Sequence, residues 1–239
     1  MQKVINKIVR KIIYWLTRAE YVSYSQFGED VLLRGFLESD WAGRWDEFCA
    51  YPGFYVDVGA HDPTVFSNTK FFYNLGWRGI NIDASSDSIS KFKKATNRDI
   101  NLNVGVGVES GNLNYYRMNM PAMNSFSEEF VKKSLRSPNV KLVDTVKVPV
   151  ERLDSLLDKY LPQGQHIDFM SIDCEGLDSE ILESSNWEKY HPDYVLIEIH
   201  TYGHNESVLE TKAAKFLIEH GYQYVGQGVV TSLFKRCNG

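Results

Sequence analysis

Two short apolar segments, each containing an acidic residue, constrain the fold of this chain most strongly. The first covers residues 54–58, contains Asp57 and runs directly into Gly59, and the second covers residues 79–83 and ends at Asp83. Both are rich in β-branched or aromatic residues, which is typical of buried strands. In an open α/β sheet, ligands bind in the crevice outside the carboxyl ends of such strands. We therefore expect Asp57 and Asp83 to face one cleft, where Gly59 lets the backbone pass close to a bound molecule.

The spacing of the two acids favours a nucleoside cofactor. A βαβ unit that binds such a cofactor places a carboxylate about 20 residues beyond its first turn, where it binds a ribose diol. Asp83 meets this requirement relative to Asp57. The alternative is that both carboxylates only cap neighbouring helices.

Composition indicates one α/β domain of ordinary globular character. Of the 239 residues, 43% are hydrophobic and 24% are charged, and the net charge of −5 disfavours a general nucleic-acid binder. The three cysteines, Cys49, Cys174 and Cys237, are far apart and odd in number. This pattern favours reduced thiols and a cytoplasmic location.

The beginning of the chain predicts an amphipathic helix over residues 1–22, followed by a globular domain over residues 23–239. Apolar residues recur at helical spacing between Ile5 and Leu16, and basic residues fill the opposite face. The segment lacks the ~20 uninterrupted apolar residues of a membrane span. It packs either on its own domain or on a second copy of the chain in a homodimer. The alternative is a peripheral contact of residues 1–18 with the inner face of an anionic membrane.

Strand-like and helix-like segments alternate, which predicts a mostly parallel sheet with helices on both faces and a C-terminal antiparallel hairpin. Residues 118–147 are polar and irregular, and we expect them to form a substrate-side loop. The expected strands cover residues 54–58, 79–83, 100–108, 113–117, 166–172, 194–200, 222–225 and 229–234. The expected helices cover residues 31–37, 64–75, 85–96, 151–160, 176–184 and 208–220.

The turn after the first strand argues against a dinucleotide cofactor. Such a site requires glycines in the pattern GxGxxG, so that the backbone can approach a pyrophosphate. After Gly59, the chain has His61 and Thr64 where the further glycines would lie. S-adenosylmethionine has no phosphates, and it offers an ammonium and a sulfonium to Asp57 and a ribose diol to Asp83. A nicotinamide-dependent dehydrogenase is the less favoured alternative.

Six short motifs carry a resemblance to a known family. In chain order they are Ser25–Asp30, Tyr55–Ala60, Gly76–Asp83, Asn103–Gly107, Val150–Asp154 and Ile172–Gly176. Over about residues 23–200, their order and spacing resemble those of the FkbM-type methyltransferases. The resemblance implies a Rossmann-like fold with a mostly parallel seven-stranded sheet, S-adenosylmethionine as cofactor, and O-methyl transfer, often to sugars in glycan or natural-product pathways. One departure is Ala84, which follows Asp83 where many members have a proline.

We expect the cofactor to be bound by residues before the first helix and at the carboxyl ends of the strands. These residues are Gln26, Asp57, Gly59, Ala60, His61, Asn68, Asp83, Ala84, Gly105 and Asp173. The expected substrate residues are Asn124, Ser125, Lys132, Arg136 and Glu175. The two basic members can meet the phosphates of a nucleotide-linked sugar. The alternative for them is a solvated face of the loop.

Catalytic groups are expected where the later strands end. Glu198 and His200 lie two residues apart and so share one face of their strand. His200 is the first candidate for the general base, and Glu198 either orients it or binds substrate. The alternative is that His200 only caps the strand exit or the helix after Tyr202. Asp173, Glu198 and His200 could instead bind Mg²⁺ or Mn²⁺. Asp178 fits a structural role in the first turn of a helix.

These expectations together describe an S-adenosylmethionine-dependent O-methyltransferase that acts on a sugar hydroxyl. The sugar is either nucleotide-linked or part of a polysaccharide or glycan precursor. Two alternatives stay open. The acceptor could be a hydroxyl of a lipid or natural product, or the chain could be a cofactor-binding scaffold without catalysis.

Overall fold

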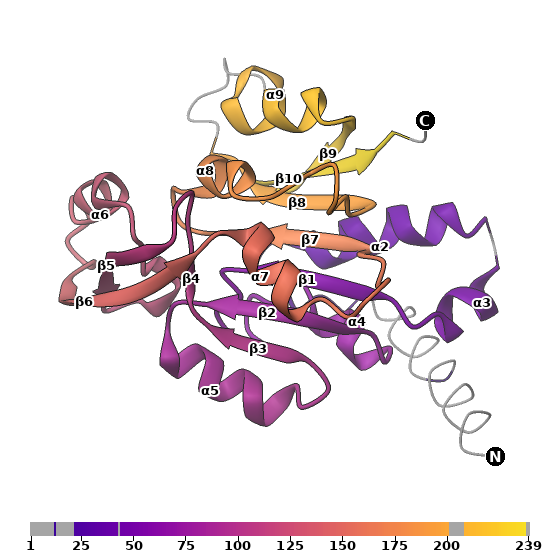
Figure 1. Ribbon diagram of the computed structural model, residues 1–239, viewed down its shortest axis with the longest axis horizontal. Helices are drawn as coiled ribbons and strands as arrows, with labels where there is room; N and C mark the ends of the chain where they lie inside the picture. The colour runs from indigo at the N-terminus through magenta and orange to yellow at the C-terminus, as the bar shows by residue number, and fades with distance from the viewer. Residues whose placement is uncertain (1–11, 13–21, 43, 201–207, 238–239) are drawn as a thin grey trace.

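The computed structural model describes residues 12, 22–42, 44–200 and 208–237 (Figure 1). The amphipathic helix expected over residues 1–22, with its dimer or membrane contact, therefore lies outside the described residues except for Ile12 and Val22. Within the described part of the chain, every helix is too short or too polar to cross a membrane.

A seven-stranded sheet forms the centre of the molecule and confirms the predicted architecture (Figure 1). The strands stand in the order β3-β2-β1-β7-β8-β10-β9. Neighbours are parallel except on the two sides of β10, so the C-terminal hairpin places one antiparallel strand beside β8. The strands are β1 (Phe54–Val58), β2 (Arg78–Asp83), β3 (Ile100–Asn103), β7 (Phe169–Ile172), β8 (Tyr194–Glu198), β9 (Tyr222–Gln227) and β10 (Thr231–Arg236).

The strand order reverses at β1. From β1 the chain proceeds through β2 to β3 on one side, and β7 and β8 follow on the other side. A reversal of this kind opens a crevice at the carboxyl ends of the two central strands. The Asp173 N–H donates to the Val58 carbonyl at 3.0 Å, which joins β1 and β7 at this point.

Helices cover both faces of the sheet, as predicted. Helices α2, α3 and α4 pack their apolar side chains on one face, whereas α7, α8 and α9 pack on the other. Helix α5 lies against β2 and β3. Successive side chains of β1 alternate between the two cores, so Val56 and Val58 point away from Tyr55. The helices are α2 (Glu29–Asp40), α3 (Trp45–Ala50), α4 (Lys70–Asn74), α5 (Ser86–Ala95), α7 (Leu153–Tyr160), α8 (Asp178–Glu183) and α9 (Lys212–Glu219), with a 3₁₀ turn η2 (Val208–Glu210) before α9.

A small second sheet lies beyond the carboxyl ends of the parallel strands (Figure 1). Its middle strand β6 pairs in parallel with β4 and antiparallel with β5. The prediction of an irregular loop over residues 118–147 was therefore wrong. Most side chains of these strands are at least partly exposed, so the sequence lacks the apolar alternation of a buried strand. The elements here are β4 (Gly105–Val106), β5 (Gly111–Met118), η1 (Pro121–Met123), α6 (Glu128–Ser134) and β6 (Leu142–Glu151).

Two other expected elements are shorter than predicted. The helix expected over residues 64–75 is reduced to α4, because Asp62 Oδ1 accepts hydrogen bonds from the backbone N–H groups two and three residues later, both at 3.0 Å. This local turn competes with the helix. The strand expected over residues 100–108 leaves the main sheet after β3, and its second half becomes β4. The remaining elements are present with ends that differ by a few residues.

Replacing Asp99 should weaken the junction of β1 and β2. Its carboxylate accepts hydrogen bonds from the Tyr55 hydroxyl at 2.8 Å, the Asn81 amide at 3.1 Å and the Gly79 N–H at 3.1 Å. Asp99→Ala removes the acceptor of the Tyr55 hydroxyl and the Gly79 N–H, and one of the two acceptors of the Asn81 amide. It should lower the free energy of unfolding by about 3 kcal/mol in a urea titration. Glu109→Ala, at an exposed position, should change it by less than about 0.5 kcal/mol. Similar losses in both variants would contradict this role.

Candidate functional site

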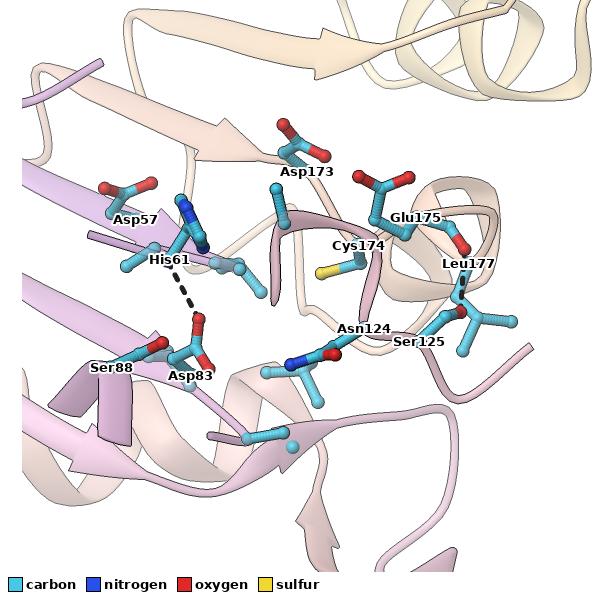
Figure 2. A pocket seen from close by; sticks show the side chains of 18 of the residues that line it. Asp57, His61, Asp83, Ser88, Asn124, Ser125, Asp173, Cys174, Glu175 and Leu177 are labelled. Atoms are coloured by element: carbon cyan, nitrogen blue, oxygen red, sulfur yellow. Dashed lines mark hydrogen bonds between the residues drawn. The ribbon is translucent and has the colours of Figure 1, made fainter. Parts of the chain in front are cut away.

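A cavity of about 940 Å³, measured to its open mouth, lies at the carboxyl ends of β1, β2 and β7 (Figure 2). The main sheet forms one side of the cavity, and residues of the second sheet and its connections form the other. All the predicted cofactor residues line it, although their role in binding stays a prediction. They are Gln26, Asp57, Gly59, Ala60, His61, Asn68, Asp83, Ala84, Gly105 and Asp173.

Gly59 fits the space between neighbouring strand ends. Its backbone has a φ of +80°, which favours glycine, and its N–H donates to the Ile82 carbonyl at 3.0 Å. A Cβ at this position would stand 1.8 Å from the Asp173 carbonyl oxygen. Any side chain would therefore push the ends of β1 and β7 apart.

Asp57 is a buried carboxylate at the edge of the cavity (Figure 2). Burial raises its pKa to about 7, and hydrogen bonds from the Thr69 and Ser171 hydroxyls oppose the shift. The Thr69 Oγ1–Asp57 Oδ2 distance is 3.3 Å, and Asn68 Nδ2 donates to Ser171 Oγ at 3.0 Å. No cation pairs with Asp57 among the residues that the structure describes. A positively charged ligand would supply the missing counter-charge.

Asp83 both supports the neighbouring backbone and lines the cavity. Its Oδ2 accepts the His61 N–H at 2.8 Å (Figure 2), and its Oδ1 accepts the Ser85 N–H at 2.6 Å. Ser85 in turn caps α5 by accepting the Ser88 N–H. Burial raises the pKa of Asp83 to about 6 against these two backbone hydrogen bonds. A helix-entry role and a ligand-binding role are compatible, because each oxygen retains a further lone pair.

Three non-glycine residues with positive φ line the cavity, at His61 (54°), Phe66 (60°) and Glu175 (50°). The rings of His61 and Phe66 stack with their centroids 6.3 Å apart. A left-handed backbone conformation is uncommon for residues other than glycine. Several such residues close together are typical of functional sites. Phe66 was not predicted to lie at the site, since it falls in the segment expected to be helical.

The second sheet and its connections contribute an aromatic and amide wall, of which the sequence predicted Asn124 and Ser125 but not Tyr115 and Phe126. The rings of Tyr115 and Phe126 have centroids 4.8 Å apart, and both residues line the cavity. Asn124 Oδ1 accepts the Met118 N–H at 2.7 Å. The Ser125 hydroxyl donates to the Glu175 carbonyl at 2.8 Å (Figure 2), which ties this wall to the loop between β7 and α8.

The predicted substrate residues divide into two groups. Asn124, Ser125 and Glu175 line the cavity, whereas Lys132 and Arg136 do not. Lys132 is exposed on α6 and pairs with an acid one turn earlier at 2.6 Å. Arg136 is exposed just after the end of α6. Their positions match the solvated alternative.

The predicted catalytic pair lies beside the cavity and not on its wall. Glu198 Oε1 is 3.1 Å from His200 Nε2, and this hydrogen bond raises the pKa of His200. Asp173, in contrast, lines the cavity. The carboxylates of Asp173, Asp178 and Glu198 each offer an oxygen within 4.8 Å of the others. The three residues that lie near enough to share a cation are therefore Asp173, Asp178 and Glu198, whereas the sequence analysis expected Asp173, Glu198 and His200.

The cavity wall is strongly acidic. Among the described residues it carries the carboxylates of Asp57, Asp83, Asp173 and Glu175 and neither lysine nor arginine. Burial, followed by the negative charge of Glu198, raises the pKa of Glu175 to about 9 and that of Asp173 well above its ordinary value.

A mostly parallel sheet whose strand order reverses at a ligand-sized crevice defines a Rossmann-like α/β fold. Residues 57–224 match the model of the methyltransferase FkbM domain. Since this match covers more than half of the chain, the protein belongs to the FkbM methyltransferase family, and the predicted resemblance to that family is confirmed. A search of curated proteins gives no match.

Gly59→Ala should destabilise the protein by about 3 kcal/mol. The added Cβ meets the Asp173 carbonyl, and the positive φ adds backbone strain. Chemical denaturation measures the loss. Gly35→Ala is the matched control, because a Cβ there has nothing within 4 Å in helix α2, and it should stabilise the protein by up to about 1 kcal/mol. Wild-type stability of the Gly59 variant would refute the close approach.

Proposed function

We propose that this methyltransferase uses S-adenosylmethionine and methylates a hydroxyl group of a sugar. The observation that carries the proposal is the presence of Asp57 and Asp83 on one acid-lined cavity. A pyrophosphate in this cavity would be repelled by the carboxylates. S-adenosylmethionine is phosphate-free and bears an ammonium and a sulfonium, so its charge complements the wall.

On the cofactor side, each predicted contact has a group of suitable chemistry. Asp57 would pair with the ammonium, because its carboxylate has only neutral partners in the described protein. Asp83 would accept hydrogen bonds from the ribose diol through its free lone pairs. Ile82, Val104 and Val106 provide an apolar part of the wall that suits a purine.

On the acceptor side, the wall favours a molecule with several hydroxyl groups. Asn124, Ser125, Asp173 and Glu175 offer hydrogen-bonding groups to it. When bound, S-adenosylmethionine supplies an electrophilic methyl group on a sulfonium that loses its charge on transfer. The protein has to hold the acceptor oxygen in line with that group, and such positioning can lower the barrier by several kcal/mol. His200 lies off the wall, so a role as general base requires a water molecule between it and the acceptor.

The carrier of the sugar is constrained by charge. Phosphates inside the cavity would be repelled by its carboxylates. A nucleotide-linked sugar would therefore keep its phosphates outside the cavity. The exposed Lys132 and Arg136 lie in the connection between β5 and β6 of the second sheet and could meet them. A glycan or polysaccharide precursor needs no such arrangement.

Binding of S-adenosylmethionine should strengthen between about pH 5.5 and 7. Burial raises the pKa of Asp57 to about 7, so this carboxyl must lose a proton before it pairs with the ammonium. The dissociation constant should fall by up to about tenfold per pH unit below that pKa, as measured by calorimetry. Asp57→Asn should bind more weakly at pH 7 and with a flatter pH dependence. Asp87→Asn, exposed on α5, should behave as the wild type. No binding at any pH would contradict the proposed use of S-adenosylmethionine.

Incubation with labelled cofactor and a panel of free, nucleotide-linked and lipid-linked sugars should yield a product heavier by one methylene. Mass spectrometry of the product identifies the modified hydroxyl. Asp83→Asn should reduce turnover, because the cofactor loses a ribose contact, and Asp87→Asn should not. If the methyl group is transferred to hydroxyls of a lipid or polyketide and never to a sugar, the sugar proposal is wrong and the non-sugar alternative holds.

A further inference from the structure

Three carboxylates from separate elements converge beside the cavity. Asp173 follows β7, Asp178 begins α8, and Glu198 ends β8. Each offers an oxygen within 4.8 Å of the oxygens of the other two. At this separation, three negative charges repel one another strongly unless a positive group lies between them.

The hydrogen bonds of the Glu198 carboxylate are a second, independent indication of a ligand at this place. Its side chain is only 8% exposed, and its Oε1 faces His200 Nε2 at 3.1 Å. Its Oε2 is buried and has no hydrogen-bond partner in the described protein. A buried carboxylate oxygen without a partner is costly, so its persistence needs an explanation.

The other two carboxylates retain capacity to bind. Asp178 Oδ1 accepts the Cys174 N–H at 2.8 Å, and Oδ2 accepts the Gly176 N–H at 3.3 Å. Both bonds fix the carboxylate in place and leave each oxygen a further lone pair. Neither Asp173 nor Asp178 forms a salt bridge with a lysine or arginine of the described chain.

We propose that Asp173, Asp178 and Glu198 bind one divalent cation of the Mg²⁺ or Mn²⁺ type at the edge of the cavity. Oxygen-only carboxylate ligands suit these hard cations, which also retain water or substrate oxygens in their shell. His200 acts behind the site, where its hydrogen bond orients Glu198. The inference rests on the proposed function in one respect: because Asp173 also lines the cavity, the cation would bind acceptor hydroxyls.

Titration of the full chain with Mn²⁺, followed by paramagnetic resonance and without cofactor or acceptor, tests the site. One bound Mn²⁺ is expected, and both Glu198→Gln and Asp178→Asn should weaken its binding by about tenfold or more. Asp193→Asn is the matched control. It alters the more exposed cluster of His166, Asp168 and Asp193, and it should leave this Mn²⁺ binding unchanged. No bound Mn²⁺ in the wild type, or unchanged binding in Glu198→Gln, would overturn the proposal.

Melting temperatures show whether a variant loses Mn²⁺ binding only because it fails to fold. Glu198→Gln removes a repelling charge and should melt no lower than the wild type when Mn²⁺ is absent. Mn²⁺ should then raise the melting temperature of the wild type but not that of the variant. A parallel titration with S-adenosylmethionine in chelator separates the two proposals. Cofactor binding without Mn²⁺ binding refutes only the cation site, and Mn²⁺ binding without cofactor binding refutes only the proposed function.

Discussion

The absence of a side chain at Gly59 is the constraint on which the whole site depends. Its N–H bonds to Ile82 on β2, and its α-carbon faces the Asp173 carbonyl at the end of β7 so closely that a Cβ would stand 1.8 Å away. The end of β1 is therefore held to β2 by a hydrogen bond and lies close against the end of β7. Because the three strand ends are held at this spacing, Asp57, Asp83 and Asp173 share one cavity.

Because these carboxylates are buried close together, their ionised forms are unfavourable when no ligand is bound. Burial raises the pKa of Asp57 to about 7 and that of Asp83 to about 6, although both accept hydrogen bonds. The desolvation that causes these shifts also strengthens pairing with a cation, because little water screens the field of a buried carboxylate. The fold thus holds negative charge in advance of a positive ligand, and binding of that ligand to the native state should stabilise the protein.

The sequence predicts those parts of the fold and site that depend on residues close together along the chain. The β-branched runs of β1 and β2, with Gly59 between them, locate the crevice and its first carboxylates. The sequence predicted part of β5 but not β6 or the pairing of the two strands, because most of their side chains are partly exposed. Nothing in the local pattern marked Tyr115 and Phe126 as residues of the site. Asp178 does hold the start of α8, as expected, but its closeness to Glu198 depends on β7 pairing with β8, which no local spacing encodes.

The two sides of the cavity come from different parts of the fold and can change separately. The main sheet fixes Asp57 and Asp83, whereas Asn124 and Ser125, in the connection between β5 and β6, would face the proposed acceptor. This wall is joined to the loop after β7 by the Ser125–Glu175 hydrogen bond, and the same loop leads from Asp173 to the start of α8. A cation bound by the proposed carboxylates would therefore order both the loop and the acceptor wall. Binding of the cation and binding of the acceptor should favour each other for this reason, even though neither contacts the adenosine side.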